Sequence, residues 1–568
     1  MKLAASLHTV LATFWRAFDL AYPLNLLVYI CFFPVLELLF YFRVGRYLKV
    51  RTKQKLAHSA ADTAEVQRFW SRAIAEESPT NIDILLRGWF LGDGPLFAGN
   101  LLELIGWTLY AMPLAELSIT QRDGAERVLA RLMQRMAPVA SFPPGYNSKR
   151  VCMLHTLEPL EPDAYKPLAF YLITRTAREL AWALLRRRGY ELRTHGALSY
   201  WFHPGSAASP PASPASVAVE LHATTSATST TPPPPPLVVL HGVGGLVPYV
   251  PLLLALRRAR PHNAQFVPLL PHCALLTPPY DPPPPLDTNR LVSGLAAALR
   301  AHAHHHHGGA ASAAKAIFVG HSLGTAILAS VAKSYPQLIG AAMLIDPICF
   351  LLYRRDVVYN FLYNCPAPLR HGPKQAFHIG YWFRLLLHYL LKREPTIQSA
   401  FRREFWWGRH WLHPDHLQCP SYVSLSGRDA IVPSHEVHSY LQERAAASAG
   451  RIHHAAASSN KSGIGEPSSN QHMEIDLHPK RHHGWALCGP RARWRLVEKL
   501  IGLEEQMSKS ARKGGMMKEE EHYHTEEDCD ASTIYTERRE RSRPMRGRPP
   551  AAAPPPRRRA SWQRSTSP

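Results

Sequence analysis

Three residues far apart in the chain carry a nucleophile, an acid and a base. Ser322 is the centre of the pentapeptide GHSLG, Asp429 lies in the stretch SGRDAIVP, and His483 lies in HHGW. A histidine that deprotonates a serine hydroxyl, and an aspartate that orients this histidine, together allow attack on a carbonyl carbon. The residue types and their order therefore predict acyl-group chemistry.

The pentapeptide has the surroundings of a nucleophile elbow. It follows the apolar run Ala316–Val319, which predicts a strand, and its His321 precedes the serine directly. A helical pattern begins at Leu323, so the serine would lie at a helix N-terminus, whose dipole stabilises negative charge. The turn is so sharp that Gly320 and Gly324 are needed to avoid a clash. A glycine-rich structural turn is the alternative.

A second glycine-rich loop lies upstream. It consists of His241, Gly242, Val243, Gly244 and Gly245 and follows the apolar run Leu237–Leu240. Backbone amides in such a loop can approach a ligand closely. We expect the amides of Val243 and Leu323 to form an oxyanion hole, each contributing roughly 2.7 to 4 kcal/mol in the transition state. A dinucleotide-binding loop is disfavoured because the G-x-G-x-x-G pattern is absent.

The acid and the base each have rivals. Asp429 follows the apolar run Tyr422–Leu425, whereas the rival carboxylate Asp346 follows another apolar run and would act if Asp429 were only a turn residue. The base must come last in this chain order, and His483 lies between a predicted strand and the final predicted helix. We expect the adjacent His482 to point elsewhere. The other candidates are His435, His438, His453, His454, His472, His478 and His482.

The elements that must position these residues predict an α/β fold with a mostly parallel sheet and helices on both faces. Short apolar runs predict strands at Leu237–Leu240, Gln265–Leu270, Ala316–Val319, Ala341–Ile345, Tyr422–Leu425 and Met473–Leu477, after two strands at Tyr190–Arg193 and Leu198–His203. Helical patterns lie between them, at Pro248–Arg260, Asp287–His302, Leu323–Tyr335, Ser434–Ala446 and Pro490–Leu503.

Composition divides the chain further. Residues 61–189 form a helical N-terminal region that ends in an amphipathic helix, Asp163–Arg188, with Leu168, Tyr171, Leu172 and Leu180 near one face. The catalytic domain covers residues 190–503, with low-complexity loop insertions at 205–236 and 445–470. The histidine run 304–307 is expected to be a solvated loop, with metal binding as the alternative. Residues 504–568 are expected to be a disordered basic tail.

Residues 350–417 are expected to form a helical cap over the site. This segment is rich in aromatic residues, namely Tyr381, Trp382, Phe383, Phe405, Trp406, Trp407 and Trp411. These rings would either line a pocket for an apolar acyl chain, with basic residues of the cap near an anionic head group, or pack the cap onto the sheet. The sequence leaves both interpretations open.

Residues 1–60 are expected to be a membrane-anchor region. Leu24–Phe42 is long and apolar enough to cross a bilayer, and a basic cluster at 43–55 follows it, which would place the catalytic domain on the cytosolic side. Glu37 and Pro34 weaken this prediction. An in-plane anchor and a buried helical hairpin are the alternatives. A cleaved signal peptide is disfavoured because no small-residue cleavage site follows.

The charge of the chain favours anionic partners. Its 568 residues include 65 Lys and Arg against 43 Asp and Glu, which gives a formal net charge of +22. Zinc-ligand spacings, recognition helices and aromatic RNA-binding motifs are absent, so a nucleic-acid partner is not expected. The basic cluster after the apolar segment indicates a membrane surface instead. The eight cysteines are scattered and predict a reducing compartment.

The order nucleophile, acid, histidine, with HGVGG ahead of GHSLG, resembles the α/β-hydrolase superfamily of serine esterases and lipases. The resemblance covers residues 190–503, and SGRDAIVP is similar to the acid-bearing turn of that family. The whole chain, including Arg87–Phe90, is similar to uncharacterised membrane-anchored hydrolases of fungi and algae. The resemblance implies the fold and the reaction class and leaves the substrate open. Serine at the elbow excludes members with an aspartate nucleophile.

We therefore expect a membrane-associated serine hydrolase that cleaves carboxylic esters, lipid-like ones above all, through an acyl-enzyme. It would need neither a metal nor an organic cofactor. One alternative is acyl transfer, in which an alcohol replaces water on the same triad. The other is a non-catalytic hydrolase-like scaffold that binds a ligand or a partner at the membrane. The sequence leaves the organelle and the oligomeric state open.

Overall fold

The computed structural model describes residues 33–160, 165–206, 234–275, 287–307, 315–364, 385, 388–458 and 473–530. Residues 1–508 form one compact unit, and residues 509–568 form a second one. Several predictions lie outside the described residues: those for Tyr381–Phe383, for most of the insertion 205–236, and for residues 459–470 and 531–568.

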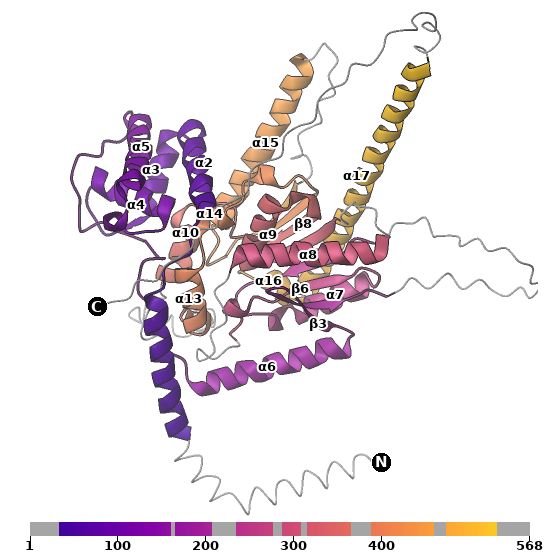
Figure 1. Cartoon of the computed structure of the whole chain (residues 1–568), viewed down its shortest axis with the longest axis horizontal. Coiled ribbons are helices and arrows are strands. Elements are labelled where there is room, and N and C mark those ends of the chain that lie inside the picture. The colour runs from indigo at the N-terminus through magenta and orange to yellow at the C-terminus, as the bar shows by residue number, and fades with distance from the viewer. Residues whose placement is uncertain are drawn as a thin grey trace, which may run out of the picture. The chain divides into compact units, whose positions relative to one another are not determined.

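An eight-stranded mixed sheet forms the centre of the first unit (Figure 1). Its strands are β3 (Glu191–His195), β4 (Leu198–His203), β5 (Leu237–Leu240), β6 (Gln265–Pro268), β7 (Ala316–His321), β8 (Ile339–Ile345), β9 (Ser421–Ser426) and β10 (Met473–His478). They follow the order β10-β9-β8-β7-β5-β6-β4-β3. Among the described pairs of this sheet, β4 pairs antiparallel with β3 and β6, and all the others are parallel. The predicted parallel core of the sheet is therefore confirmed.

Helices cover both faces of the sheet because its strands are apolar on both sides. Val238 and Leu240 of β5 belong to the core shared with α8 (Thr288–His307) and α9 (Leu323–Ser334). Leu237 and Val239 belong to the core on the opposite face. The helices of that face are α6 (Leu168–Arg187), α7 (Val250–Ala259), α16 (Trp485–Cys488) and α17 (Pro490–Asp530). Alternate side chains thus fill two separate layers.

Three helices run further than the sequence analysis predicts. The expectation of a loop is wrong for residues 304–307 of α8 and for residues 445–458 of α15 (Ser434–Ser458). The expectation of disorder is wrong for residues 504–530 of α17. Residues 445–458 are rich in alanine and residues 504–530 in Glu and Lys, which are strong helix formers, so the preceding helix continues through them. Residues 304–307 are four histidines, and their composition does not explain why α8 continues.

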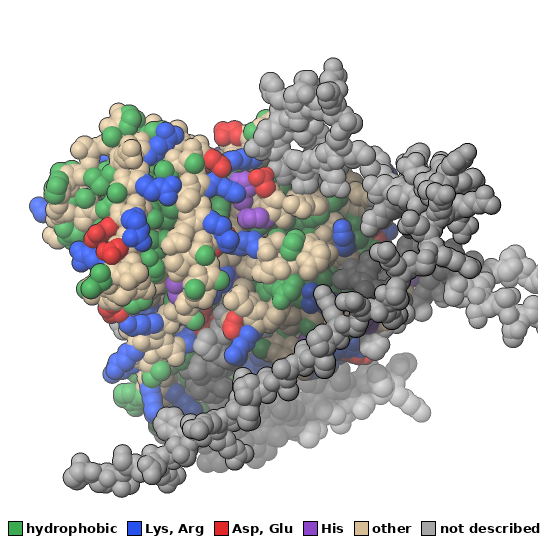
Figure 2. Space-filling model, turned by 45° about the horizontal axis from the view of Figure 1, so that its top comes forward, with side chains coloured by type: hydrophobic (Ala, Val, Ile, Leu, Met, Phe, Trp, Pro, Cys, Tyr) green, Lys and Arg blue, Asp and Glu red, His purple; other side chains and the backbone are tan. Residues whose placement is uncertain are grey.

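The N-terminal region is helical, as expected, and contains a small two-stranded sheet in addition. Its elements are α2 (Ala60–Glu76), α3 (Pro79–Gly88), β1 (Phe90–Leu91), α4 (Ala98–Tyr110), α5 (Ile119–Met136) and β2 (Val151–Cys152). Ser59 and Asp62 form a capping box at the start of α2. Figure 2 shows one face of the molecule, on which basic side chains are more widespread than acidic ones.

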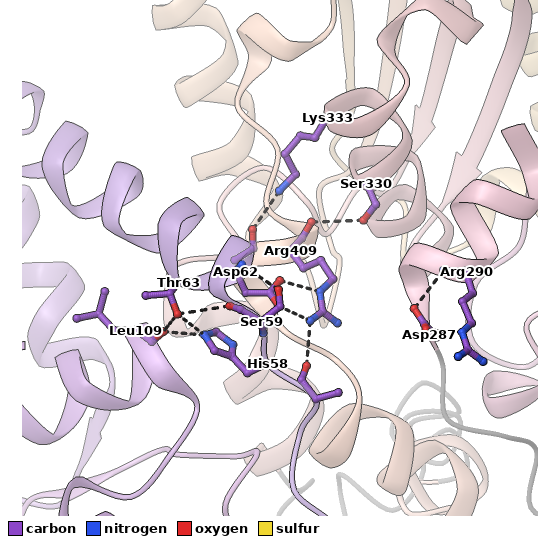
Figure 3. Close-up of polar contacts among 12 residues, drawn as sticks. His58, Ser59, Asp62, Thr63, Leu109, Asp287, Arg290, Ser330, Lys333 and Arg409 are labelled. Carbon is purple, nitrogen blue, oxygen red and sulfur yellow. Dashed lines mark hydrogen bonds and ion pairs between the residues drawn. The ribbon is translucent and has the colours of Figure 1, made fainter. Parts of the chain in front are cut away.

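An ion pair joins this region to the rest of the molecule (Figure 3). Asp62 accepts hydrogen bonds from Arg409 at 2.9 and 2.6 Å, and Arg409 also donates to the backbone oxygen of Ala57. Lys333 of α9 lies 3.6 Å from Glu65 of α2. Because α9 begins directly after Ser322, these contacts fix the N-terminal helices against the helix that carries the predicted nucleophile.

The segment predicted as a cap contains short helices among its described residues. They are α10 (Arg355–Val358), η6 (Tyr359–Tyr363), η7 (His388–Lys392), α13 (Pro395–Arg403), α14 (Trp407–His410) and η8 (Pro414–His416). Trp406 packs edge-on against Trp107 of α4, and Trp407 and Trp411 pack against Phe69 of α2. These rings are buried against the N-terminal helices. Neither of the two interpretations of the cap aromatics anticipated this partner.

Residues 33–52 form a helix that precedes the N-terminal region. Its second half is integrated into the molecule: Arg51 is buried, donates to Ser399 Oγ at 2.6 Å and pairs with Glu404. Among the residues that the structure describes, no helix combines the length and the apolar character needed to cross a membrane. Residues 24–32 of the predicted segment lie outside the described residues.

Candidate active site

The structure brings Ser322, His483 and Asp429 together into one hydrogen-bonded chain. Ser322 Oγ lies 2.9 Å from His483 Nε2, and His483 Nδ1 lies 2.6 Å from Asp429 Oδ2. Each residue follows the carboxyl end of a strand, namely β7, β9 and β10. Parallel strands end at the same edge of a sheet, so residues separated by 54 and by 161 positions meet there.

Asp429 is held rigidly. Its Oδ1 accepts the backbone N–H groups of Ile431 at 2.7 Å and of Val432 at 3.0 Å, which leaves Oδ2 directed at His483. Its side chain is fully shielded from solvent. A fixed carboxylate on Nδ1 selects the tautomer of His483 whose Nε2 can accept a proton from Ser322.

Ser322 has the strained backbone of an elbow. Its φ is +52°, in a region that side chains other than glycine rarely adopt. A Cβ on Gly324 would lie 2.1 Å from the backbone oxygen of Leu240, so only glycine fits there. Thr325 stabilises the turn, because its hydroxyl donates to Ser322 O at 2.6 Å and accepts the Ile348 N–H at 3.1 Å.

The surroundings of His483 favour its protonated form. Burial alone would lower its pKa, but the carboxylates of Asp429 and Asp346 outweigh burial and raise the pKa of His483 to about 9. Proton acceptance from Ser322 requires the neutral imidazole. The geometry therefore provides a strong base that becomes available as the pH rises.

Asp346, the rival acid, lies in the same site with a different set of contacts. Its Oδ2 accepts the Gly484 N–H at 2.7 Å and lies 3.8 Å from His321 Nε2. Burial raises the pKa of Asp346 to about 6, and Asp429 adds to this rise. The carboxylate holds the backbone beside His483, and no hydrogen bond to the His483 ring is among its described contacts.

His321 and the upstream loop form a buried network behind the serine. Tyr249 Oη lies 2.5 Å from His321 Nδ1 and accepts the Gly242 N–H at 2.6 Å. Burial and then His483 hold the pKa of His321 well below its ordinary value, so Tyr249 donates to a neutral ring. His241 Nε2 accepts the Leu270 N–H at 3.1 Å. This network positions the HGVGG loop against Ser322.

The predicted oxyanion residues Val243 and Leu323 both line the cavity beside Ser322. Gly244 and Gly245 have φ values of +98° and +79°, which explains the glycines of this loop. Gly320 packs against Gly324, as the elbow requires. His482 Nδ1 lies 3.1 Å from the backbone oxygen of Arg428, outside the hydrogen-bonded chain.

A cavity of about 710 Å³ opens at Ser322. Its walls are largely apolar and come from the cap and from the loop after β9. Sequence reasoning missed the residues that shape it: Tyr249, Ile348, Val357, Asn360, Phe361, His388, Leu391, Lys392, Phe401 and Ile431. Phe361 and Phe401 contact each other with ring centroids 4.3 Å apart. No local pattern marks these positions, because the cavity forms only when distant segments fold together.

Comparisons with known proteins gave no match to a family model and none to a curated protein. Solved structures with some similarity include a putative lipase from Acinetobacter baumannii (14% identity, 61% of this chain, 99% of that chain, TM-score 0.32). A putative aryl esterase from Burkholderia cenocepacia has 14% identity over 55% of this chain and 98% of that chain, with a TM-score of 0.32. A carboxylesterase from Bacillus subtilis has 11% identity over 59% and 98%, with a TM-score of 0.32.

The chain's own strand order carries the assignment of its fold. A mixed sheet with one antiparallel strand near its edge, helices on both faces and a strand–elbow–helix unit at β7 together define the α/β-hydrolase fold. The described features agree with the superfamily that the motifs resemble. The narrower resemblance to membrane-anchored hydrolases of fungi and algae has no support in these comparisons and stays a prediction.

Proposed function

We propose that the protein is a serine hydrolase that cleaves carboxylic esters of apolar, lipid-like acids. The observation that carries the proposal is the hydrogen-bonded chain Ser322–His483–Asp429 at the mouth of a largely apolar cavity. Fold alone would not support a reaction, because many activities share this fold.

The proposed reaction has two halves. Ser322 Oγ attacks the ester carbonyl while His483 accepts its proton, and the amides of Val243 and Leu323 stabilise the oxyanion. His483 then protonates the leaving alcohol, and an acyl-enzyme on Ser322 remains. Water, deprotonated by His483, attacks this acyl-enzyme and releases the acid. If an alcohol takes the place of water, the same residues perform acyl transfer.

The cavity walls support the proposal of a lipid-like substrate. Ile348, Phe361 and Phe401 suit an acyl chain, and the cavity is large enough for a chain of several carbons. Lys392 lies in the same wall, and its positive charge is felt at His483. An ester with an apolar acyl chain and an anionic group near the carbonyl would fit both features.

The test uses the purified full chain and its Ser322→Ala variant with a fluorophosphonate probe and with p-nitrophenyl esters of short and long chains. We expect labelling and turnover by the wild type only, with a preference for the longer chains. A folded wild type that neither labels nor turns over would leave the non-catalytic scaffold as the better interpretation. Product analysis in the presence of an added alcohol separates hydrolysis from acyl transfer.

A further inference from the structure

Helix α6 has apolar side chains on both of its sides. Ala181 and Leu185 are buried against the sheet, as expected of a surface helix, and Tyr171 is buried against the helix at residues 33–52. On the opposite side lie Leu172, Ile173, Leu180 and Leu184, with exposed fractions of 53, 70, 68 and 37%. The sequence analysis placed Tyr171, Leu172 and Leu180 near one face, whereas the structure separates Tyr171 from the two leucines. Exposed apolar side chains that lie close together on a surface helix indicate an interaction site.

The helix at residues 33–52 exposes a similar row. Val35, Leu38, Leu39 and Phe42 are between 52 and 63% exposed and follow one another at helical spacing. We call these four residues and the four exposed residues of α6 the apolar face. The two helices meet where α6 begins (Figure 1), and Phe40 packs against Tyr165 and Tyr171 there.

A partly buried contact fixes the two helices to each other. Glu37 accepts hydrogen bonds from the Tyr165 hydroxyl and from the backbone N–H of Leu168, the first residue of α6. A carboxylate at a helix N-terminus is favourable because the helix dipole is positive there. Glu37 therefore joins the first helix to the start of α6, and its carboxylate is hydrogen-bonded within the protein.

We propose that the apolar face is a docking surface for a lipid bilayer with anionic head groups. The positive charges that border the apolar face favour an anionic bilayer as the occupant. The exposed residues Arg43, Arg46 and Lys49 continue the first helix beyond Phe42, and Arg186, Arg187 and Arg188 end α6. The acidic residues of α6 and the first helix, Glu179 and Glu37, are both engaged, Glu179 with Arg178 at 2.7 Å. Apolar rows bordered by cations bind the interface of anionic membranes.

Aromatic residues lie between the apolar residues of the first helix and its cations. Tyr41 and Phe42 are 52 and 63% exposed and separate the apolar residues of the first helix from its cations. Aromatic side chains of this kind are enriched where hydrocarbon meets head groups. Helix α6 would then lie in the plane of the bilayer surface, whereas residues 33–36 would reach deeper.

The buried side of α6 and the residue Lys166 before it contact the cap segment that lines the active-site cavity. Tyr171 of α6 donates to Glu394 at 2.8 Å, and Lys166 Nζ lies 3.8 Å from the centre of the Tyr389 ring. Tyr389 belongs to η7, whose His388, Leu391 and Lys392 line the cavity. A lipid leaving the bilayer beside α6 would meet the cavity next. This last step rests on the proposed function, but docking itself does not.

The first experiment measures flotation of full-length protein with vesicles of phosphatidylcholine, with and without phosphatidylserine. The protein carries Ser322→Ala, so the result does not depend on catalysis. We expect the double variant Leu172→Glu, Leu180→Glu to lower the bound fraction at least about tenfold on anionic vesicles. The matched control is Ile84→Glu, Ile119→Glu, which changes two exposed isoleucines on α3 and α5 and should float like the parent.

The second experiment reports contact even if the first helix alone retains the protein on vesicles. An environment-sensitive fluorophore is attached to Leu172→Cys, or to Ile84→Cys as the control. Cys31, Cys365, Cys488 and Cys529 are replaced by serine, because the other four cysteines are buried. We expect nitroxide-labelled lipid to quench the label at position 172 at least about threefold more than at position 84.

Two outcomes would overturn the proposal. Equal quenching at both positions, together with unchanged flotation of the leucine variant, would mean that the apolar face does not contact lipid. A wild-type mass of two chains in light scattering that falls to one chain in the leucine variant would mean that a second copy covers the face instead. Absence of esterase activity in the wild type would overturn the proposed function and would leave the docking result intact.

Discussion

The carboxyl ends of β8 and β9 each place one aspartate beside the same histidine, with different results. Asp429 has one oxygen fixed by two backbone N–H groups and the other on His483 Nδ1. Asp346 holds the backbone of Gly484 and has its pKa raised to about 6, first by burial. The comparison shows that closeness to a histidine does not make an acid its orienting partner. The direction in which its oxygens are fixed decides the role.

The two loops explain the difference. After β9, the chain SGRDAIVP turns back so that Ile431 and Val432 present their amides to Asp429. After β8, Asp346 has a φ of +43° and follows the strand without such a turn. Its charge nevertheless contributes to the raised pKa of His483. We therefore assign it the role of a positioning residue and an electrostatic modulator.

The largest expected loss of kcat tests which histidine is the base beside the two aspartates. His483→Ala should lower kcat for an ester substrate about 10⁶-fold, because the serine loses its base. His482→Ala serves as the matched control, and it should leave kcat within about twofold because the hydrogen bond described for its ring goes to a backbone oxygen outside the triad. Equal losses in the two variants would contradict the assignment of the base.

The next effect distinguishes the two acids directly. Asp429→Asn should lower kcat about 10⁴-fold, because an amide on Nδ1 favours the wrong tautomer of His483. Asp346→Asn should cost less than about tenfold, because the asparagine oxygen can still accept the Gly484 N–H. Steady-state kinetics of both variants decide the matter. A larger loss for Asp346→Asn would reverse the roles.

A pH profile sharpens the comparison. Since only neutral His483 accepts a proton and its pKa is raised to about 9, kcat/KM of the wild type should rise with pH into the alkaline range. Asp346→Asn removes a charge that raises this pKa, so the rising limb should move to lower pH. An unmoved limb would mean that Asp346 does not act on His483.

The smallest expected effect comes from Ser426 at the end of β9. Its hydroxyl lowers the pKa of Asp346, opposing burial. Ser426→Ala should raise the pKa of Asp346 and thereby leave it neutral to a higher pH. The limb of kcat/KM should then move in the same direction as in Asp346→Asn, but by less. Titration of Asp346 by NMR in the two proteins provides the control.

Sequence reasoning located the strands and the residues that meet at their ends because these signals are local. Apolar runs and the glycines around Ser322 determine a strand, an elbow and a helix within about ten residues. The exact ends of α8, α15 and α17 were harder to predict from the sequence. The ends of α15 and α17 are alanine-rich or mixed in charge and look like loops by composition, although their helix propensity is high, whereas α8 ends in a run of four histidines.

Features that depend on distant contacts could not be predicted in this way. The cavity wall combines Val243, Phe361 and Ile431 from three separate segments. Trp406 and Trp407 were assigned to the cap, but their partners lie in helices some 300 residues earlier. Amphipathic spacing placed Leu172 near one face of α6 without showing which face the protein covers. Such pairings depend on the whole fold.

The buried Arg51 has a consequence for the modularity of this chain. Its guanidinium pairs with Glu404 and contacts Ser399, and Arg403 donates to its backbone oxygen at 3.0 Å. A chain shortened to begin at residue 61 would leave Glu404 buried without this cation, which costs several kcal/mol. The leading helix is thus part of the scaffold of the cap. A recombined protein with an unrelated helix in its place would also need a new partner for Glu404.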